Sequence, residues 1–148
     1  MLQKEKKINY LIIGNGSIAN RHIKIIKKID LKSIIYVFIR SKKKFENNSK
    51  KIKYINFLNE ELCKKIDYFY ICSPASTHNN YLFKFIEYKK SKIFIEKPLG
   101  ISSLTIEEKK IVMSHKHRIF IGYNMRFMKI IQYMKKIVRS SNIFLIKI

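Results

Sequence analysis

The sequence predicts an α/β protein built on a doubly wound, open parallel sheet. Short apolar segments, rich in β-branched and aromatic residues, alternate along the chain with segments whose apolar residues have helical spacing. The chain has 148 residues, 47% of them hydrophobic, which is enough for one domain with a sizeable core. Because strands that alternate with helices are joined by right-handed crossovers, we expect the strands to lie parallel. Ligands of such sheets bind beyond the carboxyl ends of the strands.

The composition also excludes several classes of protein. No apolar run approaches the roughly 18 residues that cross a bilayer, and the hydrophobic fraction is too high for a disordered chain. The N-terminal apolar stretch, Ile8–Ile13, is shorter than the roughly 7–15 residues at the centre of an export signal, so a strand is the better interpretation. Cys63 and Cys72 have neither metal-ligand nor CxxC spacing, so we expect reduced thiols, a cytoplasmic protein and no metal site.

The N-terminal half carries four predicted strands and two predicted helices. The first strand is apolar and ends at a glycine, and the second, SIIYVFI, is β-branched and aromatic. The helix between them has one apolar face, formed by Ile18, His22, Ile25, Ile26 and Ile29. In order, we expect a strand at Lys7–Ile13, a helix at Ser17–Ile29, a strand at Ser33–Ile39, a Lys-rich loop at Lys42–Lys51, a strand at Lys53–Ile55, a helix at Glu60–Lys65 and a strand at Tyr68–Cys72.

The C-terminal half continues the alternation. Pro74 and Pro98 each follow a predicted strand and end it. Before the second helix of this half, a sequence resembling a capping box precedes two acids that suit the helix dipole, Glu107 and Glu108. The first helix carries Leu82, Phe85, Ile86 and Lys89 on one side. In order, we expect a helix at Asn79–Lys90, a strand at Lys92–Glu96, a helix at Thr105–His115, a strand at Arg118–Gly122, a helix at Phe127–Arg139 and a strand at Asn142–Ile148.

A glycine-rich hexapeptide stands at the junction of the first strand and the first helix. Gly14-Asn15-Gly16-Ser17-Ile18-Ala19 has the pattern GxGxxA. The first glycine permits a tight turn, the second lets the backbone approach a pyrophosphate, and the alanine allows close packing of helix on strand. The amides at the helix N-terminus favour phosphate. The hexapeptide therefore predicts a dinucleotide site that includes Gly14, Gly16, Ser17, Ile18 and Ala19. A glycine-rich turn without a ligand is the alternative.

The end of the second strand indicates which dinucleotide is bound. A site for NAD commonly has Asp or Glu there, about 20 residues beyond the glycines, to bind the ribose 2′-hydroxyl. This chain has Arg40 and Ser41 followed by three lysines, without an acid. A guanidinium and a hydroxyl suit a 2′-phosphate, so we expect both residues to bind the cofactor and NADP(H) to be preferred to NAD(H). Alternatively, Arg40 is one more cation on a basic surface.

The net charge of +22 suggests a nucleic-acid or membrane partner, but the kind of charge argues against both. Lys far outnumbers Arg, whereas surfaces that read nucleic acid rely on Arg for bidentate contacts. Lys, Ile and Asn are enriched together, as is typical of an AT-rich coding sequence. We therefore expect a solvated, Lys-rich surface, no nucleic-acid partner and no membrane partner. The charge still favours anionic small molecules, phosphates in particular.

Three further motifs follow the glycine-rich turn. They are Ile71–His78 (ICSPASTH), Glu96–Leu99 (EKPL) and Gly122–Phe127 (GYNMRF). Together with GNGSIANRH at residues 14–22, they resemble the Gfo/Idh/MocA family, which includes glucose–fructose oxidoreductase and inositol dehydrogenase. The motifs occur in the family's order and at matching intervals. The resemblance covers nearly all of this chain, but only the N-terminal half of the family's architecture.

This resemblance implies a Rossmann domain that binds NAD(P), which in the family precedes a larger α/β domain. The activity that it implies is NAD(P)-dependent oxidation or reduction at a carbinol or carbonyl carbon, often of a sugar, a cyclitol or a nucleotide sugar. The cofactor contacts that it adds are Cys72, Ser73, Pro74, His78, Glu96, Lys97 and Asn124.

The resemblance also implies a catalytic residue, Lys97 of the EKP motif. Hydride leaves a carbinol carbon as the hydroxyl loses its proton, so the reaction needs a positioned acid or base. We expect Lys97 to act there and to bind substrate, and an ordinary surface lysine is the alternative. Arg126 either binds a substrate oxygen or holds a domain junction. We expect Cys72 to be a small packing residue rather than a nucleophile, and His22 a core histidine bonded to the backbone.

The chain is shorter than members of this family. We expect residues 1–126 to form the dinucleotide-binding domain, and residues 127–148 a helix and strand that lead into a truncated or missing C-terminal domain. One function is then an NADP(H)-dependent oxidoreductase that acts on a sugar-like substrate and is completed by a second polypeptide or by a further part of the same protein. The other is a non-catalytic dinucleotide-binding module, or truncated relic, that acts through a partner protein. Because the last apolar strand has nothing left to pair with, we expect a homo-oligomer or a separate partner to bind residues 141–148.

Overall fold

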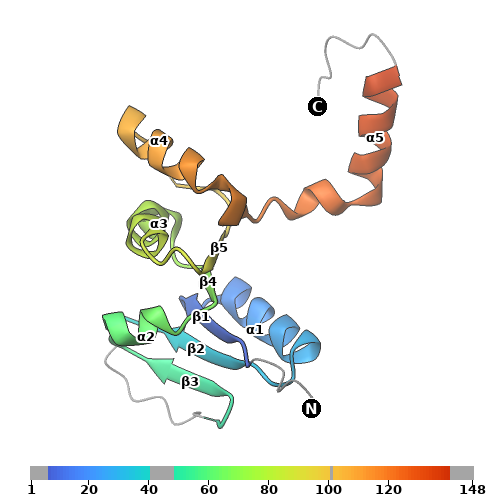
Figure 1. The fold of residues 1–148 in the computed structure, drawn as a ribbon. Coiled ribbons are helices and arrows are strands. Elements are labelled where there is room, and N and C mark those ends of the chain that lie inside the picture. The colour runs from blue at the N-terminus through green and yellow to red at the C-terminus, as the bar shows by residue number, and fades with distance from the viewer. Residues whose placement is uncertain (1–6, 41–48, 101, 141–148) are drawn as a thin grey trace, which may run out of the picture.

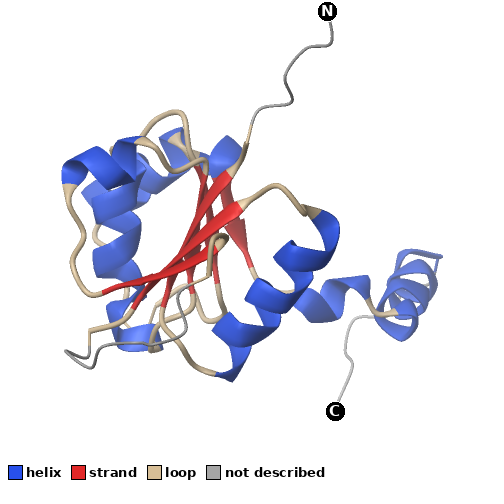
Figure 2. Cartoon of the chain, turned by 90° about the horizontal axis from the view of Figure 1, so that it is seen from below, coloured by secondary structure: helices blue, strands red, loops and turns tan. Residues whose placement is uncertain are grey.

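Six parallel strands form one sheet at the centre of the protein (Figure 2). The computed structural model describes residues 7–40, 49–100 and 102–140. The strand order is β3-β2-β1-β4-β5-β6. The first three strands are added in one direction from β1 and the last three in the other, so the strand order reverses between the neighbours β1 and β4. This order confirms the predicted doubly wound parallel sheet. The strands are β1 Asn9–Ile13, β2 Ile34–Phe38, β3 Ile52–Ile55, β4 Tyr68–Ile71, β5 Lys92–Ile95 and β6 Ile119–Ile121.

Helices lie between most pairs of successive strands and cover the two faces of the sheet unequally. Helix α1 packs on one face, and α2, α3 and α4 pack on the other (Figures 1 and 2). Short 3-10 turns precede α3, β6 and α5. The helices are α1 Ser17–Ile29, α2 Glu60–Lys64, α3 His78–Ile86, α4 Ile106–Ser114 and α5 Lys129–Ser140, and the 3-10 turns are η1 Ala75–Thr77, η2 Lys116–Arg118 and η3 Asn124–Phe127.

The core consists of two layers, one on each face of the sheet. Successive side chains of a strand point to opposite faces, so Leu11 and Ile13 join the layer under α2 and α3, while Tyr10 and Ile12 join the layer under α1. Leu11 and Ile12 are fully buried. Burying one such side chain contributes about 1.5–3 kcal/mol. Burial on both faces explains why these strands are continuously apolar in sequence.

Helix α1 has the predicted bounds but not the predicted buried face. Its buried residues are Ala19, Ile23 and Ile26, whereas Ile25 and Ile29 are exposed. The prediction took the stripe that includes Ile25 and Ile29 as the core face, which is wrong. Two apolar stripes run along this helix, and only one of them contacts the strands.

Helix α3 ends at Ile86 rather than at Lys90, and the reason lies far away in the sequence. The guanidinium of Arg118 is buried and donates hydrogen bonds to the carbonyls of Ile86, Tyr88 and Ser91. These carbonyls belong to the end of the helix and the turn after it, where the backbone lacks partners of its own. The chain therefore turns early into β5, and Lys89 is exposed rather than on the core face.

Helix α5 extends away from the sheet and the other helices (Figure 1). Its main contacts are with η3, and none of its described side chains is buried. The predicted strand at residues 142–148 and residues 42–48 of the predicted loop lie outside the described residues. None of the described helices combines the length and the apolar character that a membrane crossing requires.

Candidate dinucleotide site

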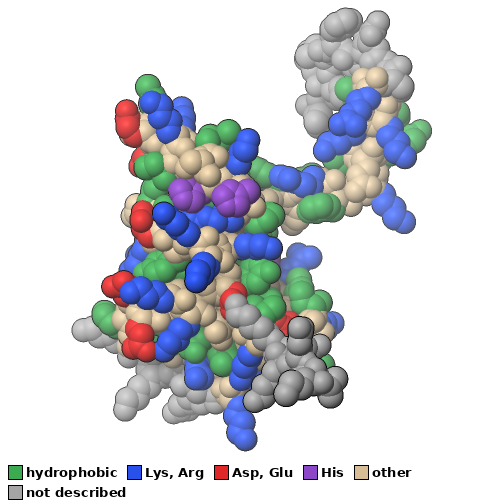
Figure 3. All heavy atoms as spheres, in the orientation of Figure 1, with side chains coloured by type: hydrophobic (Ala, Val, Ile, Leu, Met, Phe, Trp, Pro, Cys, Tyr) green, Lys and Arg blue, Asp and Glu red, His purple; other side chains and the backbone are tan. Residues whose placement is uncertain are grey.

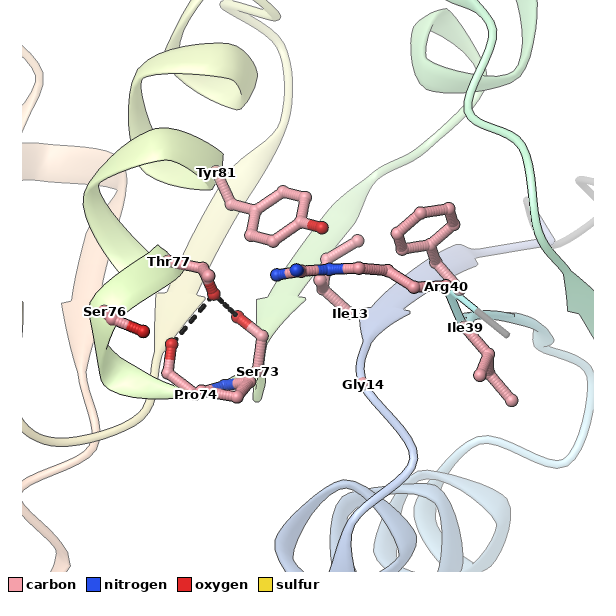
Figure 4. Close-up of a pocket in the computed structure, with 10 residues that line it drawn as sticks. Ile13, Gly14, Ile39, Arg40, Ser73, Pro74, Ser76, Thr77 and Tyr81 are labelled. Atoms are coloured by element: carbon pink, nitrogen blue, oxygen red, sulfur yellow. Dashed lines mark hydrogen bonds between the residues drawn. The ribbon is translucent and has the colours of Figure 1, made fainter. Parts of the chain in front are cut away.

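A cavity of about 310 Å³ opens at the carboxyl ends of β1, β2 and β4. This is the edge where the strand order reverses, which is the place where ligands bind in open parallel sheets. Its walls come from the glycine-rich turn, from the end of β2, and from the segment between β4 and α3 (Figure 4). The lining residues are Ile13, Gly14, Phe38, Ile39, Arg40, Ser73, Pro74, Ser76, Thr77 and Tyr81.

The glycine-rich turn has the geometry that a pyrophosphate needs. Gly14 has a φ of 111°, and a Cβ there would lie 2.8 Å from the carbonyl oxygen of Cys72, so no other residue fits without strain. A Cβ at Gly16 would meet nothing within 4 Å, which leaves open space in front of the turn. No side chain caps the N-terminus of α1. Its first amides are therefore available to an anion.

Two more residues of the predicted motif hold the turn in place. Ala19 is fully buried, as close packing of α1 on the sheet requires. The side-chain amide of Asn20 donates to the carbonyls of Asn15 and Gly16, at 3.2 and 3.1 Å. Ser17 is exposed, and Ile18 is half-buried beside a second cavity described below.

Arg40 reaches into the cavity from the end of β2. Figure 4 shows its guanidinium directed across the cavity toward Thr77 and Tyr81. Thr77 Oγ1 lies 2.7 Å from Ser73 Oγ and 2.8 Å from the carbonyl oxygen of Pro74, so its hydroxyl is fixed. The cavity thus contains a guanidinium from the end of β2 and hydroxyl groups from the segment after β4. Ser41 lies outside the described residues.

His78, by contrast, is not among the residues that line the cavity. It is 1% exposed, with Nδ1 2.7 Å from the carbonyl oxygen of Pro98 and Nε2 2.8 Å from that of Ser73. Both ring nitrogens are occupied by backbone. This arrangement does not support the predicted contact between the His78 side chain and the cofactor.

A second cavity, of about 200 Å³, lies beside the first residues of α1 and the end of β5. Glu96 and His22 meet there, with Oε1 and Nε2 2.6 Å apart and side chains 15% and 17% exposed. The ring of His22 also packs against Tyr70 and Phe94. His22 was expected to bond to backbone, and that prediction is wrong, because its partner is a carboxylate 74 positions later in the chain.

Asn124 lines this second cavity rather than the first. Arg126 is exposed, donates from Nε to the carbonyl of Tyr123 at 3.1 Å, and stacks its guanidinium 5.6 Å from the Tyr123 ring. Lys97 is exposed at the carboxyl end of the sheet, next to a cis peptide bond to Pro98. Within the described residues, Lys97 forms no hydrogen bond or ion pair with another side chain.

Cys72 directly follows β4, behind the glycine turn, and is buried. Burial and the nearby Glu96 carboxylate raise the pKa of its thiol to about 12. A thiol that holds its proton is a poor nucleophile. The geometry therefore fits a packing residue. Over the ranges that the structure describes, no three His, Cys, Asp or Glu side chains gather where they could hold a metal ion.

The strong positive charge is spread over the surface. Figure 3 shows Lys and Arg side chains scattered over several elements of one face, interrupted by apolar and acidic groups. Glu60 and Glu61 each pair with the lysine four positions later, at 2.6 and 2.5 Å. This distribution fits a solvated surface on that face.

Comparison with known proteins agrees with the motifs. Residues 8–123 match the family model described as an oxidoreductase family with an NAD-binding Rossmann fold, GFO_IDH_MocA. A curated relative, the uncharacterized oxidoreductase YrbE of Bacillus subtilis (strain 168), is 33% identical over 143 residues, which are 93% of this chain and 42% of the relative.

Solved structures share the fold at low identity. The apo scyllo-inositol dehydrogenase from Lactobacillus casei has a TM-score of 0.69 and 20% identity over 91% of this chain and 42% of that one. The WlbA dehydrogenase from Bordetella pertussis, solved with NADH and UDP-GlcNAcA, has a TM-score of 0.70 and 16% identity over 92% of this chain and 40% of that one. The chain thus spans about two-fifths of the length of these relatives. Since the family model matches residues 8–123, the chain belongs to the Gfo/Idh/MocA oxidoreductase family, through its NAD-binding Rossmann domain.

Proposed function

We propose that this chain is the cofactor-binding part of an NADP(H)-preferring oxidoreductase that acts on a sugar-like alcohol or carbonyl compound. One observation carries the proposal: Arg40, in place of an acid, extends into the cavity at the reversal of the strand order (Figure 4). A 2′-phosphate offers a guanidinium a charge-assisted, bidentate partner, which a ribose hydroxyl does not. The residues present fit a dinucleotide, because Gly14 and Gly16 leave the open cradle that its pyrophosphate requires.

The class of substrate comes from the relatives. One structural neighbour is an inositol dehydrogenase, and another was solved with a nucleotide sugar. These molecules share a ring carbon that bears a hydroxyl group. The bound nicotinamide would supply or accept the hydride at such a carbon. Lys97, exposed at the mouth of β5, would give or take the proton of the reacting hydroxyl. Arg126, also exposed beyond β6, is available to a substrate oxygen.

The cofactor preference is tested by fluorescence titration of the full chain. The affinity for NADPH should exceed that for NADH by a factor of about ten or more, since a charge-assisted hydrogen bond contributes about 1.5–3 kcal/mol. Arg40→Asp should remove this preference. Arg139→Asp, which makes the same change of charge at the far end of α5, should keep it. Equal affinities for the two cofactors in the unmodified chain, or a preference for NADH, would refute the assignment of Arg40.

A second candidate function is a dinucleotide-binding module without catalysis of its own. The observation that favours it is at Lys97, which forms no hydrogen bond or ion pair that would orient it among the described residues. The two functions differ in one result. Turnover of a cyclitol or sugar by the chain together with a separately expressed C-terminal domain of a relative would support the enzyme.

A further inference from the structure

His78 connects two loops that come from different strands. It is the first residue of α3, and its ring lies between the segment after β4 and the segment after β5. Nδ1 faces the carbonyl oxygen of Pro98 at 2.7 Å, and Nε2 faces that of Ser73 at 2.8 Å. The residue is 1% exposed, so water does not compete for either contact. Turning the ring over would place ring carbons against both carbonyls.

The two contacts together have a chemical consequence. A carbonyl oxygen accepts hydrogen bonds and has no proton to donate, so each contact requires an N–H on the ring. A neutral imidazole carries one N–H, and an imidazolium carries two. Only the imidazolium makes both bonds. In the neutral ring, the lone pair of one nitrogen faces an oxygen lone pair at less than 3 Å, and that link is lost.

We propose that His78 is a positioning residue that clamps the Ser73 loop to the Pro98 loop, and that the clamp is complete only while both ring nitrogens are protonated. The proposal rests on the proposed function, because both loops belong to the candidate site. Ser73 lines the cofactor cavity, and its neighbour Cys72 is in close contact with the Gly14 turn. Pro98 directly follows Lys97. The second ring proton of His78 thus helps to fix both the shape of the cavity and the position of Lys97.

The groups around His78 leave the two carbonyls as its partners. Cys72 directly follows β4, and its thiol stays neutral because burial raises its pKa to about 12. Glu96, at the end of β5, is engaged with the α1 histidine. Lys97 is exposed, and the phenol of Tyr81, further along α3, lines the cofactor cavity. Within the described residues, no carboxylate forms an ion pair with His78.

The first test needs no cofactor. In the full, nitrogen-15-labelled chain at low pH, one histidine should show two ring N–H protons that exchange slowly with water. Raising the pH until that ring is neutral should remove one of them and leave the other. His78→Gln should remove this pair of signals, and His117→Gln, at an exposed site, should leave it. A buried ring with a single protected N–H at every pH would overturn the proposal.

The second test measures the effect on binding. NADH is the probe, because it lacks the 2′-phosphate, whose own titration near pH 6 would interfere. Its affinity should weaken about threefold to tenfold when the pH is raised far enough to remove the second ring N–H proton, as one buried hydrogen bond is lost. His78→Gln should remove this pH dependence, and His117→Gln should not.

The outcomes separate the clamp from the proposed function. If the pH dependence persists in His78→Gln and disappears in His22→Gln, the proton belongs to the His22–Glu96 pair and the proposal is wrong. If the two protected N–H protons are present at low pH but NADH does not bind at any pH, the clamp stands and the proposed function fails.

Discussion

At the scale of single residues, Glu96 and Lys97 show how one motif serves two purposes. The two are neighbours in the chain, yet the carboxylate of Glu96 is largely buried against His22, whereas Lys97 is exposed. Adjacent side chains at the end of a strand point in opposite directions, which separates them. Glu96 thereby ties β5 to α1, whereas Lys97 is accessible to solvent. The proposed catalytic role therefore suits the lysine and not the acid.

This division of roles predicts the effect of Lys97→Met. Binding of NADPH to the 148-residue chain should change less than twofold, because Lys97 has no partner among the described residues and lies outside the lining of the cofactor cavity. Turnover in the chain complemented with a C-terminal domain should fall by about 10²–10⁴-fold, the usual contribution of a general acid or base. Lys136→Met on α5 is the control. Parallel loss of binding and turnover would instead mark Lys97 as a cofactor-holding residue.

The residues that the sequence predicted well are those whose role depends on nearby positions. Gly14 has a positive φ and Arg40 lines the cavity, and each could be placed because it directly follows a strand. The partners of His78 and His22 could not be predicted. Both histidines bind atoms on the loop after β5, and no local spacing encodes a contact between segments so far apart in the chain.

At the scale of elements, helices cover the two faces of the sheet to different extents. Tyr70, Phe94 and Phe120 lie in register across β4, β5 and β6 on the face that carries α1. Helix α1 lies over the β1 side of that face, and Phe120 remains exposed. The apolar stripe of α1 that includes Ile25 borders the second cavity, as does Phe94. The prediction for α1 failed because the stripe is apolar in sequence, although no described element covers it in the structure.

The layer under α1 contains two weakly acidic side chains, Tyr10 and Cys72, that stay protonated to unusually high pH. The protein should therefore lose stability at alkaline pH. Burial and Asp30 raise the pKa of Tyr10 to about 12, and burial raises the pKa of Cys72 to about 12. In the unfolded chain these groups ionise near their ordinary values of 10.0 and 9.0. The unfolded state then binds fewer protons than the native state, so the free energy of unfolding falls as the pH rises from about 9 to about 12.

Urea unfolding followed by circular dichroism at pH 8 and pH 10.5 tests this weakness. Each group lowers the free energy of unfolding by at most about 1.4 kcal/mol per pH unit within its window. Tyr10→Phe and Cys72→Ala should each lose less stability than the unmodified chain between the two pH values. Tyr133→Phe, an exposed tyrosine on α5, should lose as much as the unmodified chain. Equal losses in all variants would show that these buried acids do not govern the alkaline response.

The order and type of the described elements could be predicted because strand and helix periodicities alternate clearly. Their ends could be predicted less well, and α3 shows why. Nothing between Ile86 and Lys90 ends a helix by sequence, and the predicted end was wrong because Arg118 binds the carbonyls there. A guanidinium in η2 thus binds the carbonyls at the end of a helix that lies 32 positions earlier in the chain. Such long-range hydrogen bonds are a common reason why element boundaries resist prediction.

At the scale of the whole molecule, many large apolar side chains of the described residues are exposed. They include Phe120 of β6, Phe127 of η3, and Ile130 and Tyr133 of α5. Monomeric proteins rarely tolerate contiguous apolar patches of more than a few hundred Å². A net charge of +22 opposes association of two copies, but at physiological ionic strength charges further apart than about 8 Å are largely screened.

We therefore expect the 148-residue chain to associate with itself or with a partner at physiological salt, and to associate less as the salt is lowered. Residues 141–148 lie outside the described residues, but their sequence adds five more apolar side chains to this end of the chain. Sedimentation velocity of the full chain beside a version that ends at Ser140 measures how much residues 141–148 contribute to association. The shorter version should sediment as a smaller species. Met113→Gln, at an exposed site on α4, should sediment like the full chain. If the full chain is a clean monomer and trimming brings no gain in solubility, then residues 141–148 cover apolar surface of their own molecule, and the expected association is wrong.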